Sequence, residues 1–129
     1  MSMRGIRGAT TVSRNDASAI LDATQELLVA IQAANAALTP QDIASALFTL
    51  TPDLDAVYPA KAARLLGWTN VPLVCAQEIP VPGGLPLCIR VLLHWNTDLP
   101  QDGVHHIYLH HAVCLRPDIS TSMKGNLSC

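Results

Sequence analysis

One arginine stands inside an otherwise apolar stretch of this chain. Residues 83–95 read GGLPLCIRVLLHW, and Arg90 is the single charged residue among them. An unpaired buried cation is costly, so Arg90 needs an anionic partner. That partner could be Glu78 or an aspartate in a structural ion pair, or it could be an anionic substrate. Because the neighbouring sequence is poor in carboxylates, we expect the substrate to be the partner.

Most of the other cationic side chains also occupy unusual places. The chain has eight lysines and arginines. Those that lie beside glycine, proline or apolar residues are Arg4, Arg7, Lys61, Arg64, Arg90 and Arg116. Lys61 and Arg64 are three residues apart, so on a helix they share one face. Such a pair is by default a solvated surface, and a role at the rim of an anion site is the alternative.

The histidine-rich segment HHIYLHH at 105–111 is a candidate metal site. On a strand His106, Tyr108 and His110 share one face, and two such histidines can chelate a metal. No carboxylate or thiol stands at ligand spacing, so we expect no metal. Cys75 is a candidate nucleophile, but no histidine is placed to activate it. We expect Cys75 to be a small buried residue.

The scaffold that positions these residues is predicted to be α+β. Alternating or continuous apolar runs predict strands at 3–7, 47–50, 71–76, 89–96 and 104–110. Helical periodicity predicts helices at 16–36 and 58–66, with a short helix beginning at 39–40. Ser13 or Asn15 is expected to cap the long helix, Gly8 to end the first strand and Gly67 to end the last helix. The prediction is a mixed five-stranded sheet with helices on one face.

Composition limits the class of protein. The 129 residues are 50% hydrophobic, which is enough for one compact core. We expect one domain over 1–118 and a flexible tail at 119–129. Only 14% of residues are charged and the net charge is −2, which argues against binding nucleic acid or an anionic membrane. The absence of an apolar signal segment and of closely spaced cysteines favours a cytoplasmic protein.

Several motifs occur together in a characteristic order. They are RGIRGATT at 4–11, YPAKAARLLGW at 58–68, VPLVCAQE at 71–78, GGLPLCIRV at 83–91, VHHIYL at 104–109 and VCLRPD at 113–118. Together they closely resemble the monofunctional chorismate mutases of the AroH class, the Bacillus type. The resemblance covers about 3–118. It implies the Claisen rearrangement of chorismate to prephenate in phenylalanine and tyrosine biosynthesis, without cofactor or metal.

The resemblance also implies roles for particular residues. Arg90 is expected to contact the substrate's ether oxygen and a carboxylate, with Glu78 accepting the ring hydroxyl and Arg7 binding carboxylate oxygens. The other residues expected to bind substrate are Tyr108, Tyr58, Ala60, Lys61, Arg64, Leu73, Val74, Cys75, Leu115 and Arg116. The chain departs from the usual family form at Tyr58, where phenylalanine is usual, and at Leu73-Val74, where Val-Thr is usual.

The resemblance implies a homotrimer that forms a pseudo-α/β barrel, with each active site between two subunits. Two other functions remain open. One is a non-catalytic trimer that binds a small carboxylate at the same interface, although such a protein would not need Arg90, Glu78, Arg7 and Tyr108 together. The other is a deaminase of small imines on a similar trimer, which would require neither Glu78 nor the PAKAAR segment.

Overall fold

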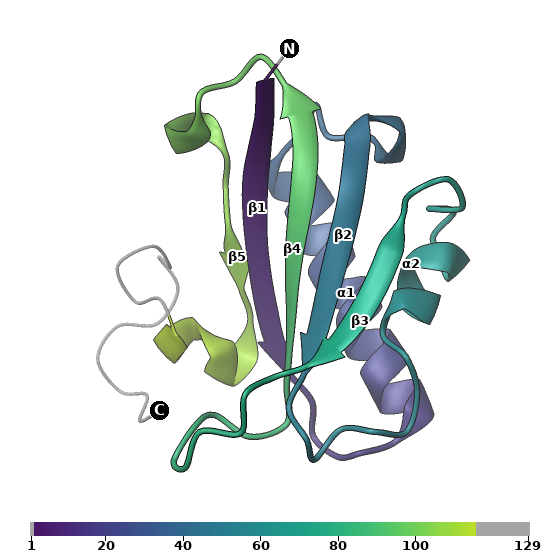
Figure 1. Ribbon diagram of the computed structural model, residues 1–129, viewed down its shortest axis with the longest axis vertical. Coiled ribbons are helices and arrows are strands. Elements are labelled where there is room, and N and C mark those ends of the chain that lie inside the picture. Colours follow the sequence, from purple (N-terminus) through teal and green to yellow (C-terminus); the bar gives the residue numbers. More distant parts are fainter. Residues whose placement is uncertain (1, 116–129) are drawn as a thin grey trace.

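The computed structural model describes residues 2–115, and these residues build one mixed five-stranded sheet (Figure 1). The strand order is β3-β2-β4-β1-β5. The strands are β1 (Ser2–Thr11), β2 (Ile43–Leu50), β3 (Leu73–Gln77), β4 (Cys88–Thr97) and β5 (Ile107–Tyr108). β4 is antiparallel to both β1 and β2, whereas β3 and β5 pair in parallel at the edges. The predicted sheet is confirmed. The predicted tail at 119–129 lies outside the described residues.

β1 is longer than predicted because Gly8 does not end it. The strand continues through Ala9, Thr10 and Thr11, which pair with β4 residues. A Cβ atom built on Gly8 would lie 2.8 Å from Cδ1 of Ile31 and 3.1 Å from Cγ1 of Val91. The glycine therefore allows the long helix to pack closely on the sheet, and its role is in packing.

The long helix is α1 (Ala17–Ala34), close to the predicted range. Its buried side chains follow helical periodicity and are Ile20, Thr24, Leu27, Leu28 and Ile31. The predicted cap is wrong, because Asp16 accepts the hydrogen bond from the Ala19 amide at 3.1 Å. Asn15 instead bonds the loop at 55–56, accepting from the amides of Asp55 and Ala56. A tertiary contact thus takes Asn15 away from the helix end.

The remaining helical segments are short. The helix predicted to begin at 39–40 is a single 3-10 turn, η1 (Pro40–Asp42), and β2 starts directly after it. α2 (Ala60–Leu65) matches the core of the predicted helix at 58–66, and Gly67 follows it with a φ of 93°. A second 3-10 turn, η2 (Gln101–Gly103), lies between β4 and β5.

The predicted strand at 104–110 is mostly wrong. Only β5 (Ile107–Tyr108) pairs with the sheet, and the 3-10 segment η3 (His110–Leu115) follows. His110 has a φ of 53°, which turns the chain out of the extended conformation. His110 therefore does not continue one strand face with His106 and Tyr108.

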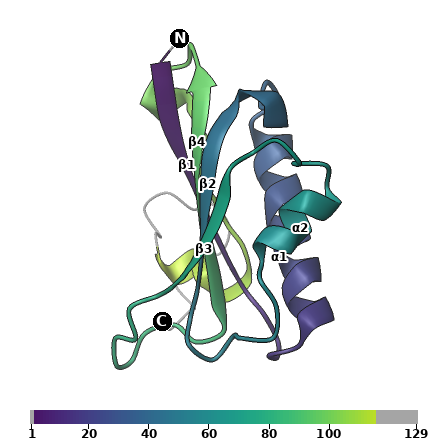
Figure 2. The ribbon, with the colours of Figure 1, turned by 45° about the vertical axis from the view of Figure 1, so that its right-hand side comes forward.

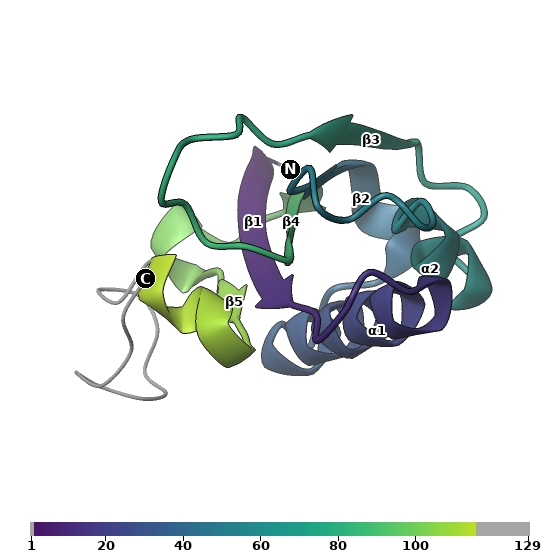
Figure 3. The same ribbon diagram turned by 90° about the horizontal axis from the view of Figure 1, so that it is seen from below.

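Both α-helices pack on the same face of the sheet (Figures 2 and 3). The main core lies between them and the inward side chains of the strands, including Ile6, Phe48, Leu93 and Trp95. No described helix covers most of the opposite surface of the sheet. We call this surface the open face. Strand alternation and pairing place on it Arg7, Ala9, Leu47, Thr49, Val74, Ala76, Arg90, Leu92 and His94.

Candidate active site

Arg90 lies near the centre of the open face. It is in β4, where its two cross-strand partners are Ala9 of β1 and Thr49 of β2. Its inward neighbours Ile89 and Val91 are buried in the core, so alternation directs the Arg90 side chain away from the helices. β4 is largely apolar because one of its faces packs in the core. Arg90 belongs to the opposite face of the strand, which is the open face.

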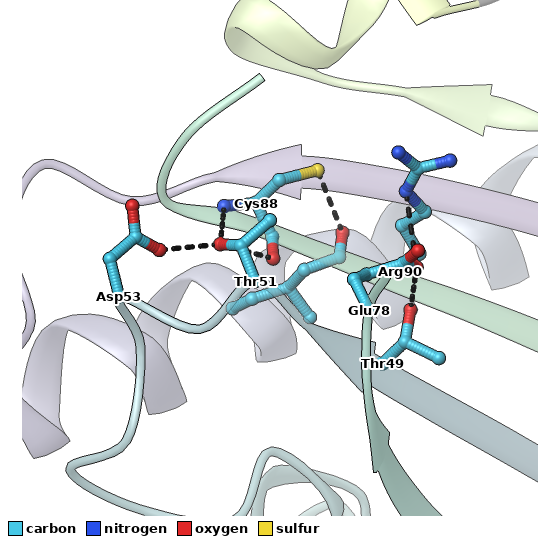
Figure 4. Close-up of polar contacts among 7 residues, drawn as sticks. Thr49, Thr51, Asp53, Glu78, Cys88 and Arg90 are labelled. Carbon is cyan, nitrogen blue, oxygen red and sulfur yellow. Dashed lines mark hydrogen bonds and ion pairs between the residues drawn. The ribbon is translucent and has the colours of Figure 1, made fainter. Parts of the chain in front are cut away.

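Arg90 has a partner within the chain, contrary to the expectation from sequence. Its Nε lies 3.3 Å from Oε2 of Glu78, which follows the end of β3 (Figure 4). The Glu78 amide donates to the Leu50 carbonyl at 2.8 Å and so extends the pairing of β3 with β2. The structural ion pair that the sequence allowed as an alternative is therefore present.

The ion pair leaves Arg90 incompletely satisfied. Nε is buried and makes no hydrogen bond within residues 2–115, because the 3.3 Å contact to Glu78 lacks hydrogen-bond geometry. The contact is therefore coulombic. The two terminal guanidinium nitrogens point away from Glu78 in Figure 4. The Arg90 side chain is 32% exposed, so these donors remain accessible to a ligand.

Tyr108 presents a second unsatisfied polar atom. The residue is 4% exposed, and its buried hydroxyl has no hydrogen-bond partner in the part of the chain that the structure describes. Tyr108 pairs with Ala9, the residue that also pairs with Arg90. Leu115 packs against the same small cluster. A buried hydroxyl without a partner is costly, and a polar ligand can satisfy it.

Arg7 joins this group from β1. It pairs with Leu92, two residues along β4 from Arg90, so the two arginines are on the same face of adjacent strands. The backbone amide of Arg7 donates to Nδ1 of His106 at 2.9 Å. The side chain of His106 thus provides a hydrogen-bond acceptor for a β1 amide beside the short β5. The sequence suggested His106 only as a metal ligand, and its hydrogen bond with the Arg7 amide was not predicted.

Cys88 lies beside Arg90 on β4 and is fully buried. Burial raises the pKa of the Cys88 thiol, and the positive charge of Arg90 partly offsets this effect. The Cys88 amide donates to the hydroxyl of Thr51 at 2.9 Å, and that hydroxyl in turn donates to Asp53 at 2.6 Å (Figure 4). These contacts fix the start of β4. Neither Thr51 nor Asp53 was singled out in the sequence, because ordinary turn residues carry no signal of such a role.

The other predicted site residues form a separate group at the β3 edge. Tyr58 is 72% exposed, and Lys61 and Arg64 are exposed on α2. Tyr58 and Cys75 line a pocket of about 220 Å³. Val74 points to the open face, whereas Leu73 and Cys75 point toward the core. Ala60 is itself a core residue, and Arg116 lies outside the described residues.

A larger cavity, of about 910 Å³, is lined by other residues. It is lined by the first half of α1, the loop at 85–87 and the start of η3. None of the predicted site residues lines it. We place the site at Arg90 because the buried Nε of Arg90 and the buried hydroxyl of Tyr108 lack hydrogen bonds there, and because Arg90 forms an ion pair with Glu78. Within residues 2–115 no three histidine, cysteine, aspartate or glutamate side chains gather to hold a metal ion.

The described structure thus defines an α+β protein with a candidate site around Arg90, where two buried polar atoms, Nε of Arg90 and the hydroxyl of Tyr108, have no hydrogen-bond partner among residues 2–115. The chorismate mutase type I family matches residues 3–119, and the chain belongs to this family. "Chorismate mutase AroH" of Thermus thermophilus is 51% identical over 120 residues, covering 93% of this chain and 98% of the relative. "Chorismate mutase AroH" of Bacillus subtilis (strain 168) is 49% identical over 128 residues, covering 98% and 100%.

A solved structure agrees with these relatives. A chorismate mutase from Clostridium thermocellum superposes with a TM-score of 0.83 at 50% sequence identity. The match covers 85% of this chain and 97% of that one. Fold and sequence therefore point to the same family.

Proposed function

We propose that this protein is a chorismate mutase, an isomerase that converts chorismate to prephenate in the biosynthesis of phenylalanine and tyrosine. Relatives that carry this name are about half identical to the chain over nearly its whole length. The observation that carries the proposal is Arg90, whose buried Nε lacks a hydrogen bond and whose terminal nitrogens point away from Glu78. A dianionic substrate supplies the acceptors that these donors lack.

The reaction needs no proton transfer and no nucleophile. One C–O bond breaks while one C–C bond forms, and negative charge grows on the ether oxygen. The protein has to hold the compact conformer and place a fixed cation at that oxygen. Arg90 is suited to this role because its guanidinium has several donors in one plane and stays charged. Its apolar neighbours lower the local dielectric constant and strengthen the contact.

The remaining groups bind and orient the substrate. Arg7 and Tyr108 bind carboxylate oxygens from β1 and β5, next to Arg90. Glu78 accepts a hydrogen bond from the ring hydroxyl. No cofactor is needed, and we propose that the protein acts in the cytoplasm without nucleic acid or membrane as a partner. None of the described helices combines the length and apolar character needed to cross a bilayer.

We further propose that the active protein is a homotrimer. The predicted substrate-binding residues form two groups in one chain, one around Arg90 and one around Tyr58, Lys61 and Arg64. A neighbouring subunit that covers the open face can bring its second group to the first. The open face carries the exposed Val74 and the partly exposed Leu47 and Leu92, which supports its burial in an assembly.

One experiment tests the activity. Purified protein is mixed with chorismate, and the loss of substrate absorbance is followed with chromatographic detection of prephenate. We expect catalysed conversion that a chelator such as EDTA does not change. Binding of chorismate without conversion would instead support the carboxylate-binding module. Inactivation by EDTA would show that a metal takes part.

A further inference from the structure

Thr49 is a residue of the open face to which neither the motifs nor the proposed reaction assigns a role. We propose that Thr49 is a positioning residue, whose hydroxyl orients the Glu78 carboxylate so that one oxygen is held in the sheet and the other is free for the substrate. This inference rests on the proposed function, because there Glu78 binds the substrate's ring hydroxyl.

The register of the sheet places Thr49 between the two charged groups. Thr49 in β2 pairs with Arg90 of β4 on one side and with Ala76 of β3 on the other. Glu78 lies two residues beyond Ala76, so both belong to the same face. The hydroxyl of Thr49 donates to Oε2 of Glu78 (Figure 4). That same oxygen lies 3.3 Å from Nε of Arg90.

Thr49 supplies the directional contact that Arg90 does not. The Arg90–Glu78 contact lacks hydrogen-bond geometry, so it attracts the carboxylate without fixing its rotation. The Thr49 hydrogen bond fixes Oε2. Among residues 2–115 no hydrogen bond or ion pair engages Oε1 of Glu78. The Glu78 side chain is 21% exposed, so it remains partly accessible to a ligand.

The kinetic test compares Thr49→Val with Thr49→Ser. Valine keeps the shape of threonine and removes the hydroxyl, whereas serine keeps the hydroxyl. We expect Thr49→Val to lower kcat/KM by about 5- to 50-fold, the effect of one hydrogen bond to a charged group, mainly through a higher KM. Thr49→Ser should stay within about 3-fold of wild type. Thr24→Val is the matched control, because Thr24 is a fully buried threonine that bonds only its own helix.

A spectroscopic test reads the contact without substrate. Glu26 and Glu78 are the only glutamates in the sequence, so protein labelled with ¹³C at the glutamate side-chain carboxyl gives two signals. Glu26 lies 2.8 Å from Nε2 of His110, in a different contact, and serves as the internal reference. At fixed pH, Thr49→Val should shift the Glu78 signal and leave the Glu26 signal in place. Neither Thr49→Ser nor Thr24→Val should shift the Glu78 signal in this way.

A double-mutant cycle tests whether Thr49 acts through Glu78. In a Glu78→Ala background, Thr49→Val should change kcat/KM by less than about 2-fold, because the group it positions is gone. An undiminished loss in that background would overturn the proposal, since Thr49 would then act on the substrate or on the fold.

The outcomes separate the two proposals. If the wild-type protein does not convert chorismate, the proposed function fails and the positioning role fails with it. If the wild type converts chorismate and Thr49→Val keeps wild-type kcat/KM, only the positioning role fails. The same holds if Thr24→Val lowers kcat/KM as much as Thr49→Val.

Discussion

Arg90 combines two environments that rarely meet in one residue. Its backbone belongs to a central strand whose inward side chains form the core. Its guanidinium lies on the open face, close to one carboxylate and with an unsatisfied Nε. The sheet holds the backbone of Arg90 in place, so the proposed mechanism needs little reorganisation of this cation during the reaction.

The first prediction concerns the charge and shape of Arg90. Lysine has a compact head that cannot span a carboxylate and the ether oxygen, and citrulline keeps the hydrogen-bonding shape but loses the charge. We expect both substitutions to lower kcat by more than about 10²-fold, as removal of a preorganised oxyanion donor does. Citrulline should lower kcat more than lysine does, because a positive charge is needed to stabilise the negative charge that develops on the ether oxygen. Steady-state kinetics with chorismate measures this.

The fold should survive both substitutions, as the circular dichroism spectrum can show, because lysine still pairs with Glu78 and citrulline is still polar. Near-normal kcat with citrulline would contradict the electrostatic role of Arg90. If Arg90→Lys raises KM and leaves kcat unchanged, Arg90 serves only to bind the substrate.

At the scale of elements, the close packing of α1 on β1 depends on Gly8. Gly8→Ala places a methyl group within 2.8 Å of Ile31 and 3.3 Å of Leu27. We expect this overpacking to lower the free energy of unfolding by about 1–3 kcal/mol. Gly5→Ala is the matched control in the same strand, since its Cβ would meet Leu92 at an ordinary 3.6 Å, and it should change stability by less than about 0.5 kcal/mol.

Urea unfolding at one protein concentration measures both alanine variants. Equal stability of the two would show that α1 can move away from the sheet at no cost.

The start of α1 depends on the charge of Asp16. Hydrogen bonds from the Ser18 hydroxyl and the Ala19 amide lower the pKa of the Asp16 carboxyl. A carboxyl with a lowered folded-state pKa stabilises the fold above its unfolded-state pKa, and this contribution is lost as pH falls through the folded-state value. Asp16→Ala should therefore lower Tm at pH 7, and the difference from wild type should shrink below about pH 4.

Asp16→Asn serves as the control, because asparagine also caps helices and does not titrate. Its Tm at pH 7 should lie between those of wild type and Asp16→Ala. A difference between wild type and Asp16→Ala that persists unchanged at pH 2 would show that the charge does not contribute.

At the level of the whole molecule, the proposed trimer would bury the open face. We expect the protein to sediment as a trimer at micromolar concentration. Val74→Lys places a charge on an open-face residue that is 58% exposed in the single chain, and it should reduce both the sedimenting mass and the activity. Val29→Lys is the control, since Val29 is 52% exposed on α1. An active monomer would contradict the interfacial site.

Features that depend on local patterns could be predicted from the sequence. Alternation and apolar runs identified the strand around Arg90, and helical periodicity identified α1 with its buried Ile20, Leu27 and Ile31. The glycine after α2 was also predictable, because a helix end depends on neighbouring residues. The family was predicted in another way, from the resemblance of six motifs in their order along the chain. The local patterns were enough to predict the α+β class and the presence of five strands, although only Ile107 and Tyr108 of the last predicted strand are extended.

Contacts between residues far apart in the sequence could not be predicted in this way, because they depend on how the elements pair and pack. Glu78 approaches Arg90, and Thr49 lies between them, because β2 pairs with both β3 and β4 in one register. Gly8 looked like a strand end but accommodates α1, and His110 looked like a strand residue but turns the chain at a positive φ. Local propensity is weak compared with packing and pairing between elements far apart in sequence, and a single sequence does not reveal those contacts.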